Sequence, residues 1–168
     1  MIVCIVYLII SFLLENIMAS IFPATLGSVS YFTTIYTIIS LVVIYPYFVN
    51  EKKYYILVIV FGALFDILYT STLLINIVFF LLLAVVIKLL NTFIPNNILT
   101  INVISILCII IYHVLSFVLL NLETSQTYDL ILLGKIISHS ILMTIIYTSI
   151  SYIVIRFIYN KFDIKMVK

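Results

Sequence analysis

Five ionisable residues of this sequence lie inside long apolar stretches: Glu15, Asp66, His113, Lys135 and His139. Hydrocarbon solvates charge poorly, so ionisable side chains in such stretches pair with one another or mark a functional site. Carboxylates, imidazoles and an amine have the chemistry to bind a ligand, to relay protons or to join helices by hydrogen bonds. Which of these they do depends on the elements that position them.

The composition places those elements in a membrane. Of 168 residues, 66% are hydrophobic and 8% are charged, and the mean hydropathy is +1.41, whereas about a quarter of the residues of a soluble domain are charged. Residues 16–50 and 89–122 contain no Lys, Arg, Asp or Glu, and a helix needs about 20 residues to span a bilayer. Unbroken apolar runs such as residues 81–87 exclude the alternating pattern of a membrane β-barrel. The sequence therefore predicts an all-α integral membrane protein.

Polar and turn-forming segments divide the apolar sequence into six predicted spans. The start of the chain lacks the positive charge and the cleavage site of a signal peptide, so we expect it to be a retained first span. No soluble domain or linker is indicated. We predict one transmembrane domain over residues 1–168, a six-helix bundle with spans at about residues 2–21, 31–49, 54–68, 73–90, 98–120 and 130–158.

The positions of the cations predict the orientation of the bundle. Lys and Arg in short loops stay on the cytoplasmic side. With both termini in the cytoplasm, Lys135 is the one cation on the outer side, and the other seven of the eight are cytoplasmic: Lys52, Lys53, Lys88, Arg156, Lys161, Lys165 and Lys168. The four from Arg156 onward favour contact with anionic lipid. A net charge of +2, with its cations scattered, does not indicate a nucleic-acid partner.

The depth of the five ionisable residues places them in one layer. A helix rises about 1.5 Å per residue through a hydrocarbon core of about 30 Å, so all five fall in its outer half. Glu15 and Asp66 are each predicted to pair with Lys135, which lowers the cost of burying single charges. Gly134 and Ser138 form a pair of small residues that would let another helix come close. Asn16 and Asn76 join the same layer.

We interpret Glu15, Asp66, Asn76, His113, Lys135 and His139 as an intramembrane polar cluster. Three roles stay open at this point: holding the bundle together, lining an outward-facing ligand cavity, or docking the transmembrane helix of another protein. Proton transfer has little support, because no polar path continues to the cytoplasmic side.

Catalysis has no sequence signature. A serine in a G-x-S-x-G context, paired intramembrane aspartates and an H-E-x-x-H zinc motif are all missing from the sequence. Cys4 and Cys108 lie in apolar runs outside any CxxC or CxxH pattern, and the spacing of His113 and His139 does not favour a metal site. We therefore expect no enzyme activity, no metal and no cofactor.

Residues 61–74 carry a more specific signal. A glycine and an aspartate four residues apart, Gly62 and Asp66, lie in an apolar helix that leads through a tight turn into the next span. This segment resembles the best-marked stretch of the rod shape-determining protein MreD family. Thr70 and Leu74 stand where that family usually has small residues, mostly glycine.

The resemblance implies a non-enzymatic subunit of the bacterial elongation machinery, located in the cytoplasmic membrane as a multi-pass protein. Members of the family bind the bitopic protein MreC within the membrane. They act with the MreB filament, RodA and a class B penicillin-binding protein in lateral peptidoglycan synthesis, which determines cell shape.

An alternative is the substrate-binding subunit of an energy-coupling-factor vitamin transporter, a class whose fold is similar to that of MreD. Such a subunit would use the outer polar layer as its substrate cavity. Against it, the chain has no tryptophan and three glycines, and its first span lacks the usual Ala-x-x-x-Ala pair. The sequence leaves homodimer formation open, since it contains no Gly-x-x-x-Gly motif.

Overall fold

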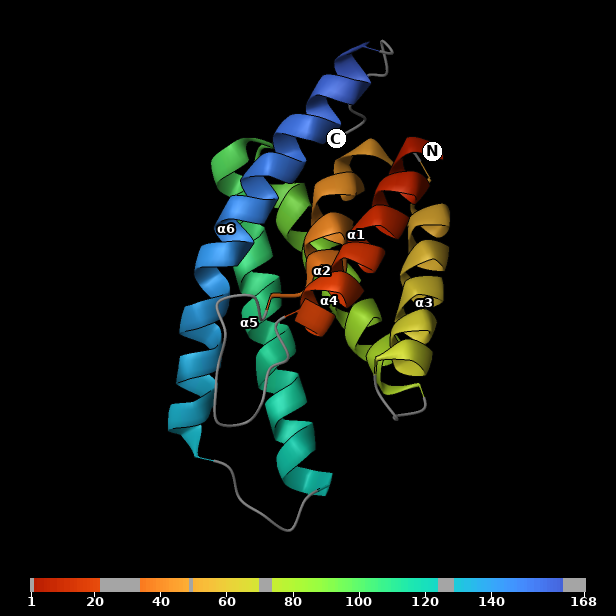
Figure 1. Cartoon of the computed structure of the whole chain (residues 1–168). Coiled ribbons are helices and arrows are strands. Elements are labelled where there is room, and N and C mark those ends of the chain that lie inside the picture. The colour runs from red at the N-terminus through yellow and green to blue at the C-terminus, as the bar shows by residue number, and fades with distance from the viewer. Residues whose placement is uncertain (1, 22–33, 49, 70–73, 124–128, 162–168) are drawn as a thin grey trace.

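The computed structural model describes residues 2–21, 34–48, 50–69, 74–123 and 129–161 (Figure 1). Every regular element within these residues is a helix, as the sequence predicted. The elements are α1 (Ile2–Ile21), α2 (Tyr36–Ile44), the 3-10 helix η1 (Tyr45–Tyr47), α3 (Glu51–Leu68), α4 (Ile75–Phe93), α5 (Ile98–Glu123) and α6 (Leu130–Lys161).

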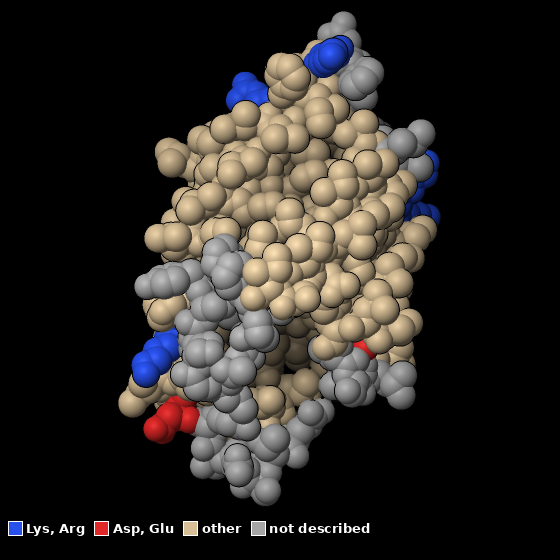
Figure 2. All heavy atoms as spheres, viewed as in Figure 1, with Lys and Arg blue, Asp and Glu red and all other residues tan. Residues whose placement is uncertain are grey.

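Three of the described helices are long and apolar enough to cross a membrane, namely Ile75–Phe93, Ile98–Leu122 and Leu130–Lys161. Shorter apolar helical segments occupy Val3–Met18 and Tyr36–Tyr47. Figure 2 shows a wide band of uncharged side chains across the face turned to the viewer, with charged side chains toward its upper and lower ends. On this face the charged side chains thus lie toward the two ends of the helices, and the uncharged band lies between them.

The short helix α2 lies at the centre of the molecule. All nine of its residues are buried, and α1, α4, α5 and α6 each contact it. Elsewhere α3 packs against α4, and α5 packs against both α4 and α6. Phe12 of α1 also contacts Phe61 of α3, with ring centroids 5.8 Å apart. Because neighbouring helices surround α2, its polar groups must find their partners within the protein.

Helix α2 is shorter than the span predicted for residues 31–49. The proline ring of Pro46 lacks an N–H and disfavours continuation of an α-helix, and the chain passes into the 3-10 helix η1 at Tyr45. The N–H of Phe48 closes that turn by donating to the carbonyl of Tyr45 at 3.1 Å. Residues 31–33 and 49 of the predicted span lie outside the described residues.

The other helix boundaries differ from the prediction by a few residues. Helix α3 begins at Glu51, three residues earlier than predicted, because the side chain of Asn50 caps it by accepting from the Lys52 N–H at 2.9 Å. Helices α5 and α6 end later, at Glu123 and Lys161. Where the start of α3 lies beside the last turns of α4, Lys88 Nζ is 2.7 Å from Glu51 Oε2 in an ion pair.

Candidate functional site

Asp66 caps the start of a neighbouring helix. It lies on α3 and has 5% of its surface exposed. Its carboxylate accepts from the backbone N–H groups of Asn76 and Ile77, at 3.1 and 3.3 Å, and from Asn76 Nδ2 at 2.9 Å. The first N–H groups of a helix have no partner within that helix and attract negative charge. The carboxylate thus satisfies the first turn of α4 from outside it.

Gly62 makes this capping contact sterically possible. It lies one helical turn before Asp66 on α3, and a Cβ atom built on it would lie 2.9 Å from the Cα of Ile77. Such a Cβ would also lie 3.3 Å from the carbonyl oxygen of Asn76. Glycine therefore lets the first turn of α4 approach α3 closely enough to reach the carboxylate.

Asn76 extends the contact to a third helix. The hydroxyl of Tyr112 on α5 donates to Asn76 Oδ1 at 2.8 Å, while Asn76 Nδ2 donates to Asp66. Asp66, Asn76 and Tyr112 are all buried, and we call them the Asp66 network. A fully partnered polar network of this kind fixes how three helices sit against one another.

Glu15 performs a parallel role at the start of α2. It lies on α1 with 8% of its surface exposed. Its Oε2 atom accepts from the N–H of Thr37 at 3.2 Å and from the Thr37 hydroxyl at 2.6 Å. Each of the two buried carboxylates, Glu15 and Asp66, therefore caps the helix that follows its own in the chain.

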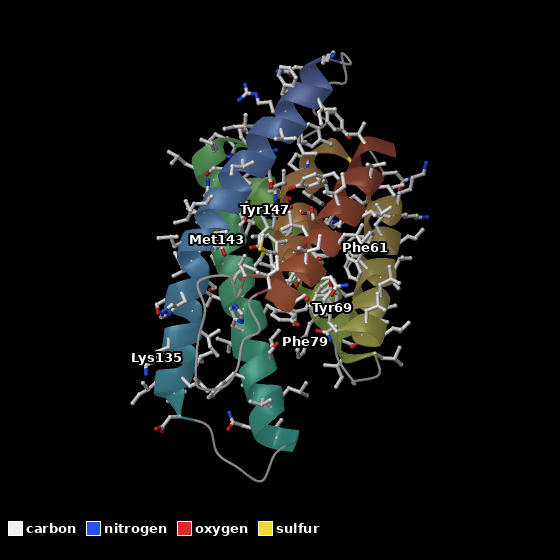
Figure 3. The ribbon with its side chains drawn as sticks, in the orientation of Figure 1. Phe61, Tyr69, Phe79, Lys135, Met143 and Tyr147 are labelled. Atoms are coloured by element: carbon white, nitrogen blue, oxygen red, sulfur yellow. The ribbon has the colours of Figure 1, made fainter. Side chains whose placement is uncertain are left out.

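The expected pairing of these carboxylates with Lys135 is wrong. Lys135 is exposed on α6, and Figure 3 shows its side chain at the outer edge of that helix, directed away from the others. His139 Nδ1 lies 2.8 Å from the carbonyl oxygen of Lys135, on the same helix. Gly134 is exposed too, and a Cβ there would meet nothing within 4 Å. The small pair of Gly134 and Ser138 thus does not bring another described helix close.

His113 does not join either capping contact. Its ring lies 6.1 Å from that of Tyr112, centroid to centroid. Its Nε2 atom is buried without a hydrogen-bond partner among the described residues. No group of three His, Cys, Asp or Glu side chains within the described part of the chain is placed to hold a metal ion.

The predicted cluster therefore divides into separate parts. Glu15 and the pair Asp66–Asn76 cap helix starts. His113 takes part in neither of these capping contacts, and Lys135 is exposed on α6. Two partners were missed from the sequence. Thr37 carried a weak signal, as a hydroxyl at the start of an apolar helix, and Tyr112 another, as a tyrosine far from either end of its span.

A groove of about 460 Å³ runs between α1 and α6, both of which pack against α2. Its lining residues recur at spacings of three and four on each helix, so each helix contributes one face over about 17 Å. The lining is apolar apart from two tyrosines and a serine. From α1 it consists of Val3, Val6, Tyr7, Ile10 and Leu14, and from α6 of Tyr147, Ile150, Ser151, Val154 and Ile158.

Comparisons of the chain with known protein families, with characterised proteins and with solved structures gave no match.

Proposed function

We propose that this chain is a non-enzymatic scaffold of the bacterial cytoplasmic membrane that acts as MreD proteins do, by binding the transmembrane helix of MreC in the complex that elongates rod-shaped cells. In this proposal it crosses the membrane six times, with both termini in the cytoplasm. Through MreC it supports lateral peptidoglycan synthesis together with MreB, RodA and a class B penicillin-binding protein.

The distribution of exposed residues supports the six-span arrangement. Large aliphatic side chains cover the outward faces of α1 and α3 as well as the three long helices, and Ile10 and Ile56 are 54% and 58% exposed. Water would disfavour so large an apolar surface, whereas lipid favours it. The first turn of α1 and the last turn of α6 lie at the same end of the molecule (Figure 1), as an even number of crossings requires.

The roles of the buried carboxylates support a scaffold over a transporter subunit or an enzyme. Asp66 and Glu15 are engaged with backbone N–H groups of α4 and α2. The groove between α1 and α6 is lined by neither of them and by none of Asn76, His113, Lys135 and His139. The two buried carboxylates are thus used in helix packing, while the groove opens at the apolar surface.

The groove between α1 and α6 is the observation that carries the proposal. It is formed by two helix faces, and it is apolar except near Tyr7, Tyr147 and Ser151. A third helix can pack against two such faces along about three of its turns. Within a membrane, helices associate largely through packing, and the apolar side chains on the two faces of the groove supply the surface for it. We propose this groove as the MreC docking face.

Affinity purification of the tagged protein from its native membrane, with and without groove variants, tests the proposal. Ile10→Trp and Val154→Trp fill the groove from its two sides, and Ile59→Trp adds the same bulk to an exposed position on α3 that does not line it. We expect MreC to be recovered with wild type and with Ile59→Trp, and to be lost with both groove variants.

Two results would overturn the proposal. Recovery of MreC with wild type and with all three tryptophan variants would exclude the groove as the docking face. If the two groove variants then lost a lipid that co-purifies with wild type, an acyl chain would be the occupant of the groove. Recovery of a pair of ATPases with a transmembrane coupling subunit, in place of MreC, would instead identify a transporter subunit.

A further inference from the structure

A second cavity, of about 660 Å³, lies between α6 and the segment that joins α4 to α5. Its polar lining consists of Asn96, Asn97, Tyr152, Arg156 and Asn160. This end of the molecule also holds the first turn of α5 and the last turns of α6. It is separate from the groove between α1 and α6, with which it shares no lining residue.

Arg156 is held in this cavity by a neighbouring aromatic side chain. Its Nη1 atom donates to the hydroxyl of Tyr152 at 3.1 Å, and its guanidinium lies 5.8 Å from the centroid of the Tyr152 ring. Tyr152 itself is buried, so it orients the cation from one side. A guanidinium has five N–H groups, and a single hydrogen bond to Tyr152 leaves most of them available.

The charge of the lining selects an anion. Among the described residues, no carboxylate lies within salt-bridge distance of Arg156, and the lining contains no acidic side chain. Asn97 uses its Oδ1 atom to accept from the Thr100 N–H at 2.8 Å, which leaves its amide nitrogen as a donor. A planar guanidinium beside amide donors matches the oxygens of a phosphate group.

The apolar part of the lining selects a lipid as the source of that phosphate. Ile153 and Phe157 on α6 line the same cavity and are 58% and 68% exposed. They continue the apolar outer face of α6 directly up to Arg156, one turn or less away. A molecule with a phosphate at one end and a hydrocarbon chain at the other would meet both parts at once.

We propose that this cavity binds the phosphodiester headgroup of an anionic phospholipid, with Arg156 as the principal contact, Asn97 and Asn160 as further donors and the acyl chains along Ile153 and Phe157. The site is independent of the scaffold function, because it requires no protein partner. It also differs from general attraction of the basic end of the chain to a charged surface, since it assigns the contact to one cation and one cavity.

Lipid titration of the purified full-length protein tests this site. The probes are dioleoylphosphatidylglycerol and dioleoylphosphatidylcholine, and native mass spectrometry counts the bound lipids. We expect wild type to prefer phosphatidylglycerol, and Arg156→Gln to bind it about tenfold more weakly, as expected for the loss of a charged hydrogen bond. Lys161→Gln is the matched control, because Lys161 is exposed on the same helix but does not line the cavity.

A second variant and a second probe make the result independent of Arg156 alone. Asn160→Ala should weaken phosphatidylglycerol binding in the same direction but less, since a neutral donor is lost. Inorganic phosphate distinguishes the source of the ligand. If phosphate alone raises the melting temperature as much as the lipid does, and Arg156→Gln abolishes both effects, the site takes soluble phosphate. If only the lipid acts, the acyl chains contribute.

Two outcomes would overturn the assignment. One is equal binding of the two lipids by wild type, with no effect of inorganic phosphate. The other is an equal loss of phosphatidylglycerol binding in Arg156→Gln and Lys161→Gln. That result would mean that the lipid is attracted non-specifically to surface charge and does not occupy a specific binding site.

Discussion

The carboxylate of Asp66 and the backbone of Ile77 meet across two helices, with Oδ2 3.3 Å from the Ile77 N–H. The same residue of α4 lies against Gly62, where a Cβ would come within 2.9 Å of its Cα. The glycine and the aspartate therefore act on one point, the first turn of α4, from adjacent turns of α3. Their four-residue spacing follows from this arrangement, because residues four apart lie on one helix face.

Replacing Asp66 with leucine should destabilise the protein by about 2 to 4 kcal/mol, since the substitution leaves several buried donors of α4 without an acceptor. Unfolding in mixed detergent micelles, followed by circular dichroism, measures the loss. Asp66→Asn keeps one carbonyl acceptor and should lose less. Ile67→Leu, at the exposed neighbouring position, serves as the control. An Asp66→Leu protein as stable as wild type would contradict the capping role.

The chain offers a matched pair of glycines for testing the close approach. Gly62→Ala should cost about 1 to 3 kcal/mol, because the new methyl group meets backbone atoms that cannot rotate away. Gly134→Ala, with open space around the site, should be neutral or raise stability by about 0.5 to 1 kcal/mol through helix propensity. Melting temperatures of the two variants give the comparison. If Gly62→Ala and Gly134→Ala changed stability equally, or if Gly62→Ala did no harm, α3 and α4 would have room to separate.

Leu74 should be improved by glycine. It stands just before α4 with φ at 70°, and the left-handed region costs an ordinary residue about 1 to 2 kcal/mol. The side chain is 65% exposed, so little packing is lost. After subtracting glycine's larger chain entropy, Leu74→Gly should raise stability by about 0.5 to 1 kcal/mol. Leu74→Val, with a branched Cβ, should lower it. A rise in melting temperature with valine would refute the explanation.

The membrane orientation can be measured with single cysteines. The two native cysteines are buried, so a membrane-impermeant maleimide should leave them unlabelled. Asp129→Cys, just before α6 on the proposed outer side, should react in intact cells, and Lys53→Cys should react only after the membrane is permeabilised. Both positions are exposed in the structure, which makes them equally reactive once reached. The reverse pattern would invert the proposed topology.

The sequence predicted the helices better than their contacts. The bounds of α1 agree with the predicted first span, because an unbroken apolar run ends at loop-forming residues. For α2, Pro46 signalled the end of the helix, but the predicted span ran past it. Position 74 was marked by the family resemblance as one that usually holds a small residue, and the positive φ of Leu74 gives a physical reason for that preference.

The polar contacts were harder to predict because a sequence gives the depth of a residue but not the rotation of its helix. Glu15, Asp66 and Lys135 have similar predicted depths, which suggested ion pairs. In the structure α6 turns Lys135 outward, and both carboxylates find backbone N–H groups instead. A buried carboxylate needs donors, and a helix start supplies them as well as a lysine does. Residue types alone do not distinguish the two solutions.

The central position of α2 has a consequence for how the protein enters its membrane. Nine helical residues extend about 14 Å, less than half of a hydrocarbon core of about 30 Å. Its first turn depends on Glu15 of α1, so on its own in lipid α2 would carry unmet donors. We therefore expect α2 to leave the insertion machinery together with α1, as a hairpin whose capping contact has already formed, and not as a single segment.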